Sequence, residues 1–192
     1  MILYVIIISV GIAIAMALGL GIGIPINITT DGEVLLTILI TFIALLAIDA
    51  IVAAIVHALP RKWFNPFKKI YKVFDWERKF YTKIGIKKWK DMIPETGAAL
   101  TGFGKDKVID LKTKEYVMKF MEETVYAEVL HFLSFIVSFV VIFINLKLAW
   151  LVGIPMILCN GVLQIMPVMT QRYNRPKLMV LYKRNQRRES KE

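Results

Sequence analysis

"VLLTILITFIALLAIDAIVAAIVHAL", residues 34–59, is dominated by aliphatic side chains and carries only one formally charged group, Asp49. A helix of this length rises by about 39 Å at ~1.5 Å per residue, which is enough to cross the ~30 Å of hydrocarbon in a bilayer. The run therefore predicts a membrane-spanning helix over Val34–Leu59.

Three further apolar runs have the same character, and the whole chain of 192 residues is 57% hydrophobic. A soluble domain of this length is not normally so apolar. Pro25, Asp31-Gly32, Pro60 and a polar turn at 145–147 separate the runs. Together the runs predict an all-α, polytopic membrane protein with four transmembrane helices in two hairpins, over Ile2–Ile24, Val34–Leu59, Tyr126–Leu146 and Leu148–Met169.

Small residues recur at intervals of four in the first run, at Gly11, Ala15, Gly19 and Gly23. This ladder predicts a face for close helix packing. The run is long and has no positively charged residues before it, so we interpret it as a retained span, not a cleaved signal peptide. The single cysteine, Cys159, excludes a disulfide framework, and its apolar setting is more typical of a buried small residue than of a nucleophile.

Charge divides the chain into a first hairpin (1–60), a cytoplasmic amphipathic connector (61–125), a second hairpin (126–171) and a basic tail (172–192). The connector holds 16 of the 25 Lys+Arg and the tail holds 8, which leaves only Lys147 elsewhere. By the positive-inside rule, the connector, the tail and both termini are predicted to be cytoplasmic. The net charge of +10 lies beside apolar runs, so we expect it to face membrane lipids and not nucleic acid.

The connector interleaves aromatic residues with lysines, a pattern that suits the headgroup layer or a simple membrane anchor. Residues 95–107, "ETGAALTGFGKDK", have the composition of a loop. Thr113 is placed to cap a helix that begins at Lys114 and continues into the third span.

Ionisable residues within the predicted spans are candidates for function, because charge is costly in hydrocarbon. Asp49 and His57 lie in the second span, where Asp49 alternatively holds helices together. Glu128 and His131 are three residues apart in the third span and therefore neighbours on one helix face. Either Glu128 orients His131 as a general base, or the pair simply stabilises the hairpin.

The fourth span places Asn160, Gln164 and Gln171 on roughly one face that leads into "QRYNRPK", residues 171–177. Asn160 and Gln164 are also consistent with hydrogen bonding between helices. Pro176 biases Arg175 toward extended geometry, which predicts a turn. Planar guanidinium groups suit bidentate binding of phosphate or carboxylate, whereas a plain anchor would need charge alone.

Three strings, "KFYTKIGIKKWKDMIPE" (79–95), "YAEVLH" (126–131) and "TQRYNRPKL" (170–178), resemble the bacterial glycosyl-4,4'-diaponeurosporenoate acyltransferase family. The resemblance covers roughly residues 75–182. It implies that a fatty acyl chain is transferred to a sugar hydroxyl of a lipid-linked glycoside, either a carotenoid glucoside or another glycolipid. It also implies a bacterial cell-membrane enzyme whose acyl donor is acyl-CoA or an acyl carrier protein.

On this interpretation His131 is the base, Glu128 orients it, and Asn174, Gln171 or an arginine stabilises the intermediate. Substrate contacts are expected from Arg172, Tyr173, Asn174, Arg175, Gln171, Gln164, Asn160 and Trp89. The sequence carries no serine elbow, metal-ligand cluster or Walker loop. We therefore expect direct transfer without a cofactor or a metal.

Two alternatives remain at this point. A small multi-span reductase or methyltransferase would use the same arginines to hold a nucleotide cofactor, and purified protein would then carry that nucleotide. A non-enzymatic membrane scaffold would need charge alone, and arginine-to-lysine changes at residues 172 and 175 would then be harmless.

The predicted topology is testable with single cysteines. Cysteines at Lys105 and Ser190 should be shielded from an impermeant thiol reagent in intact cells, whereas one at Asp31 should react, because basic segments stay cytoplasmic. Labelling of position 105 from outside would overturn the topology.

Overall fold

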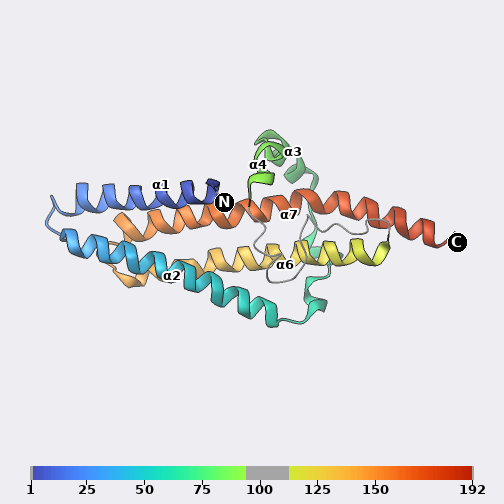
Figure 1. The fold of residues 1–192 in the computed structure, drawn as a ribbon, viewed down its shortest axis with the longest axis horizontal. Helices are drawn as coiled ribbons and strands as arrows, with labels where there is room; N and C mark the ends of the chain where they lie inside the picture. The colour runs from blue at the N-terminus through green and yellow to red at the C-terminus, as the bar shows by residue number, and fades with distance from the viewer. Residues whose placement is uncertain (1, 94–112, 192) are drawn as a thin grey trace. The chain divides into compact units, whose positions relative to one another are not determined.

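The computed structural model describes residues 2–93 and 113–191, and within these ranges the elements are helices without a strand (Figure 1). The long elements are α1 (Ile2–Leu18), α2 (Asp31–Ala58), α6 (Lys114–Ser138) and α7 (Ile154–Glu189). The short helices that lie between α2 and the undescribed residues are η2 (Arg61–Phe64), η3 (Lys69–Tyr71), α3 (Asp75–Lys83), α4 (Ile86–Trp89) and η4 (Lys90–Met92). The predicted all-α fold is confirmed.

Four of the described helical stretches are long and apolar enough to cross a membrane: Ile2–Gly23, Asp31–Ala58, Lys114–Ile144 and Ala149–Glu189. Each contains one of the predicted spans almost entirely, and the helix that begins directly after Thr113 does continue into the third span. The arrangement of the spans as two hairpins across a bilayer stays a prediction.

Departures from α-helical geometry occur at the ends of three spans. Residues Gly19–Gly23 (η1) and Ala149–Gly153 (η7) form π-helices, and Phe139–Ile144 (η6) is a 3-10 helix. The sequence of η1 is "GLGIG", and glycine weakens the α-helix because it carries the largest backbone entropy cost. Both π-helices and 3-10 helices close hydrogen bonds within their own backbone, which is what a membrane span requires.

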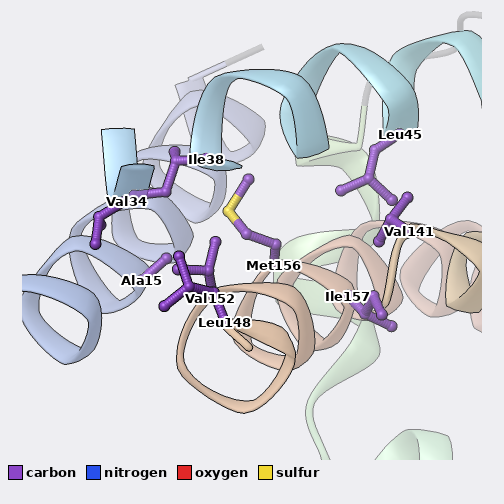
Figure 2. Close-up of a cluster of buried hydrophobic side chains, with 9 residues drawn as sticks. All are labelled: Ala15, Val34, Ile38, Leu45, Val141, Leu148, Val152, Met156 and Ile157. Carbon is purple, nitrogen blue, oxygen red and sulfur yellow. The ribbon is translucent and has the colours of Figure 1, made fainter. Parts of the chain in front are cut away.

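The chain forms two compact units, which we describe separately. Unit 1 comprises Met1–His57 and Leu130–Ile165. Its core draws side chains from α1, α2, η6, η7 and α7, and Figure 2 shows the Met156 side chain extending among them. The buried residues of this core are Ala15, Val34, Ile38, Leu45, Val141, Leu148, Val152, Met156 and Ile157.

The small-residue ladder of the first span lies on the buried side of unit 1, as predicted. Gly11, Ala15, Gly19 and Gly23 are all buried. A Cβ atom at Gly11 would lie 2.8 Å from the Cβ of Cys159, so α1 and α7 approach each other closely here. The contact also places Cys159 as a packing residue of α7.

Asn145 organises the turn between η6 and η7 in unit 1. Its Oδ1 accepts hydrogen bonds from the backbone N–H groups of Lys147 and Leu148. Its Nδ2 donates to Glu33 Oε1 and Thr37 Oγ1, both at 3.1 Å, and so ties the turn to the first part of α2. The predicted turn at 145–147 is confirmed.

Unit 2 comprises Ala58–Val129 and Met166–Glu192. The first half of α6 packs on the second half of α7 through a cluster formed by Val117, Met121 and Leu178. A second cluster joins α3 and α4 to α7 through Tyr81, Ile86 and Tyr173. Residues 95–107, which the sequence indicates as a loop, and the Lys105 labelling position lie outside the described residues.

The turn predicted at Pro176 is absent, because α7 continues through Pro167 and Pro176 to Glu189. An interior proline costs about 3 kcal/mol through its missing N–H and its steric clash. Contacts on both sides of Pro176 oppose this cost, since Arg175 is only 2% exposed and Leu178 is buried against α6. Tertiary packing therefore overrides the local preference.

Gly11 generates a stability prediction. Gly11→Ala should destabilise the protein by about 1–3 kcal/mol, because the added methyl group overpacks the contact with Cys159. Gly21→Ala is the matched control, since a Cβ there meets nothing within 4 Å. Thermal unfolding of both variants in one detergent is the measurement. Equal melting temperatures would contradict the close approach of α1 and α7.

Candidate active site

The residues singled out by sequence fall into two groups, one in each unit. Asp49, His131, Asn160 and Gln164 belong to unit 1 and form a hydrogen-bonded cluster. Glu128, Arg172 and Arg175 belong to unit 2 and form an ion-pair network, while Trp89, Gln171, Tyr173 and Asn174 lie in the same unit. The structure does not bring His57, which is exposed at the end of α2, into the unit 1 cluster.

Gln164 is the centre of the unit 1 cluster. Its Oε1 lies 2.7 Å from Nδ1 of His131 on α6. Its Nε2 donates to both carboxylate oxygens of Asp49 on α2, at 3.0 and 2.9 Å. Three helices therefore contribute to one chain of hydrogen bonds, which runs from a carboxylate through an amide to an imidazole.

Asn160 lies one turn before Gln164 on α7 and is 7% exposed. Its Oδ1 accepts a 3.4 Å hydrogen bond from Gln164 Nε2, and its buried Nδ2 has no hydrogen-bond partner among the described residues. A buried amide donor without a partner loses its hydration at a cost of about 1–3 kcal/mol. Such a donor is available to a bound reactant.

Ser134 is a member of the unit 1 cluster that sequence reasoning missed. It is completely buried and lies near Asp49, and its hydroxyl oxygen has no hydrogen-bond partner among the described residues. A signal was present, because Ser134 follows His131 by three residues and shares its helix face. A small hydroxyl in an apolar span is common, however, and does not by itself indicate a site.

Glu77 on α3 is the centre of the unit 2 network and was also missed. Arg172 binds it with a planar fork, from Nε to Oε2 at 2.6 Å and from Nη2 to Oε1 at 2.8 Å. The Tyr81 hydroxyl donates to Oε2 and the Phe74 backbone N–H donates to Oε1, both at 2.9 Å. Glu77 is 3% exposed and its carboxylate has four donors, so its charge is well compensated.

Glu128 on α6 links the two arginines. One carboxylate oxygen accepts from Nη1 of Arg172 and the other from Nη2 of Arg175. Arg175 is 2% exposed and also donates to Thr124 Oγ1 at 2.9 Å and to the Tyr71 carbonyl at 3.0 Å. Two guanidinium groups and two carboxylates therefore balance each other inside unit 2.

These contacts change the interpretation of the Glu128–His131 pair. The ring of His131 is held by Gln164, whereas both oxygens of Glu128 are engaged by arginines. Charge-assisted bonds to guanidinium groups are about twice as strong as neutral hydrogen bonds. Glu128 and His131 are therefore neighbours on one helix face, but each binds other partners.

Opposing effects act on the ionisable groups of α3. Burial tends to raise the pKa of Glu77, but hydrogen bonds from Arg172, Phe74 and Tyr81 lower it below its ordinary value. Burial and the neighbouring Glu77 raise the pKa of Tyr81 to about 12. Near neutral pH, Glu77 is therefore an anion and Tyr81 a neutral donor, which keeps this part of the network intact.

Tyr173 and Trp89, which the sequence indicated as substrate contacts, take part in apolar packing within unit 2. Tyr173 is 6% exposed, and it clusters with Tyr81 and Ile86, against which Trp89 packs. The Nζ atom of Lys177 lies 4.7 Å from the centre of the Tyr173 ring. Gln171 and Asn174 are half-buried on α7.

Residues 60–184 match the family model of glycosyl-4,4'-diaponeurosporenoate acyltransferase. Neither the curated proteins nor the solved structures yielded a match. The matched region is well over half of the chain and contains every residue of both groups except Asp49. His57, which belongs to neither group, also precedes it. The chain therefore belongs to the glycosyl-4,4'-diaponeurosporenoate acyltransferase family, and it is an acyltransferase with four helices apolar enough to span a membrane.

Proposed function

We propose that this protein esterifies a sugar hydroxyl of a lipid-linked glycoside with a fatty acyl chain inside the bacterial cell membrane. The acceptor is a carotenoid glucoside or another glycolipid, and the donor is an acyl thioester of coenzyme A or of an acyl carrier protein. Family membership supports the reaction class. The bond between His131 Nδ1 and Gln164 Oε1 is the observation that supports His131 as the base.

An amide oxygen only accepts hydrogen bonds, so a neutral His131 in this contact carries its proton on Nδ1. The lone pair then lies on Nε2, where it accepts the proton of the sugar hydroxyl. As that proton leaves, the hydroxyl oxygen bonds to the thioester carbonyl carbon and a tetrahedral intermediate forms. When the carbon–sulfur bond breaks, the imidazolium returns the proton to the departing thiolate, which yields an ester and a thiol.

The intermediate carries negative charge on the former carbonyl oxygen, and a well-placed donor there contributes about 3–4 kcal/mol. We assign this role to Nδ2 of Asn160, because it is a buried donor beside Gln164 that has no partner in the described part of the chain. Gln171 and Asn174 remain alternative donors by residue type. The arginines suit this role less well, because the carboxylates of Glu77 and Glu128 already occupy them.

We assign Arg172 and Arg175 to the internal stability of unit 2. Arg172 bridges α3 to α6 through Glu77 and Glu128, and Arg175 joins α7 to Thr124 and to the Tyr71 carbonyl. A donor phosphate at these groups would have to displace two protein carboxylates. Partners within the protein thus account for the two arginines of "QRYNRPK".

The assignment of the base predicts the effect of one substitution. His131→Ala should lower turnover by about 10²-fold or more, the usual effect of losing a positioned base. Phe132→Ala, at the next position on α6 and 57% exposed, is the control and should keep its activity. Turnover would be measured in nanodiscs with an acyl thioester and a glycolipid acceptor. Normal turnover in folded His131→Ala would remove His131 from the mechanism.

The structural role assigned to the arginines predicts that replacing Arg175 lowers the stability of the protein. Arg175→Lys should destabilise the protein by about 1.5–3 kcal/mol, because an ammonium group cannot reproduce the planar contacts to Thr124, Tyr71 and Glu128. Arg187→Lys, at an exposed position near the end of α7, should be neutral.

Thermal unfolding and kinetics of Arg175→Lys together decide whether Arg175 stabilises the protein or binds a substrate. A lower melting temperature with near-normal KM, measured well below that temperature, supports the structural role. A raised KM without loss of stability would instead show that Arg175 binds a reactant.

A further inference from the structure

We propose that Asp49 is a positioning residue that sets the tautomer of His131 through the side chain of Gln164. The catalytic consequence of this proposal rests on the proposed function, whereas the tautomer itself is a property of the protein without substrate. Asp49 lies outside the matched residues 60–184, so the first half of unit 1 would contribute directly to the chemistry.

The first step of the argument concerns the direction of the Gln164 amide. Both oxygens of Asp49 lie within 3.0 Å of the same Gln164 atom. A carboxylate only accepts hydrogen bonds, and even a protonated carboxyl group has a single donor, so an atom that faces both oxygens is the amide nitrogen. Asn160 Oδ1, a further acceptor, lies 3.4 Å from the same nitrogen and favours the same direction.

The second step follows from the planarity of the amide. Once Nε2 faces Asp49, Oε1 is directed elsewhere, and it lies 2.7 Å from Nδ1 of His131. Gln164 is only 6% exposed, so water does not readily replace these partners. The amide oxygen requires a proton on Nδ1, and the carboxylate therefore determines the state of a ring that it does not touch.

The third step is the effect of removing the carboxylate charge. Asparagine at position 49 has nearly the same shape but offers a donor as well as an acceptor. The Gln164 amide can then reverse, and its NH₂ group would donate to Nδ1. The ring would carry its proton on Nε2 and would have no lone pair there to accept the proton of a hydroxyl group.

The positioning role also explains why an apolar helix contains a carboxylate at position 49, where charge is costly. Within unit 1 this carboxylate accepts both of its hydrogen bonds from Gln164. If Asp49 only joined helices, asparagine could replace it, since an amide side chain also forms hydrogen bonds between helices. The positioning role requires an acceptor without a donor, and this difference makes the two explanations separable.

The test uses ¹⁵N NMR of histidine-labelled protein in nanodiscs, without substrate. The His131 signals are assigned as those absent from His131→Gln. In the wild-type protein we expect a protonated Nδ1 and an unprotonated Nε2. In Asp49→Asn we expect the Nε2-protonated tautomer to become the main form, whereas Asp49→Glu should keep the wild-type tautomer. Asp31→Asn, at the exposed start of α2, is the control for a change of charge on the same helix.

Kinetics of the same variants supply the second readout. Asp49→Asn should lower kcat by at least about tenfold, because the base is in the wrong tautomer. Its melting temperature, measured beside that of Asp49→Glu, identifies any general loss of folding. An Nε2-protonated His131 in the wild-type protein, or an unchanged tautomer in folded Asp49→Asn, would overturn the proposal. The expected change of tautomer with unaltered turnover would support it and would overturn His131 as the base.

Discussion

The absence of water from the hydrocarbon region is the constraint on which the rest of this structure depends. Every polar group placed there needs a partner within the protein, because an unpaired group costs several kcal/mol. The apolar runs meet this requirement by forming helices, and the helical irregularities lie at the ends of spans. Asp49, His131 and Gln164 meet it by binding one another across three helices.

The same constraint orders the hydrogen-bond donors and acceptors of the unit 1 cluster. A carboxylate that only accepts hydrogen bonds stands at one end, and an imidazole that can donate or accept stands at the other. In the positioning role proposed for Asp49, Gln164 transmits the preference of the carboxylate to the imidazole, because the two polar atoms of an amide are unlike and its plane is rigid. The proposed transfer to a sugar hydroxyl would require a base of defined tautomer, since this nucleophile reacts poorly while it keeps its proton.

Unit 2 uses charge differently. Two arginines and two glutamates form a compact network that is largely shielded from solvent. Buried ion pairs offset their desolvation only when the geometry is good and the remaining donors and acceptors are satisfied. Here the forked contact of Arg172 with Glu77 and the four donors around Glu77 meet that condition. The network connects α3, α6 and α7, and through Arg175 it holds α7 directly before Pro176.

The sequence by itself determined the spans, the helix that begins at Lys114, the small-residue face of the first span and the family. These features depend on local composition, periodicity or short strings, which are complete in one stretch of chain. Tertiary structure decided the partner of His131, the partners of Arg172 and Arg175, and the helical path through Pro176. Glu77 and Ser134 were missed because each gains its importance from residues distant in sequence. Helical spacing shows which residues share a face. The residues opposite that face depend on how the helices pack. Each polar group then binds the strongest partner within its reach.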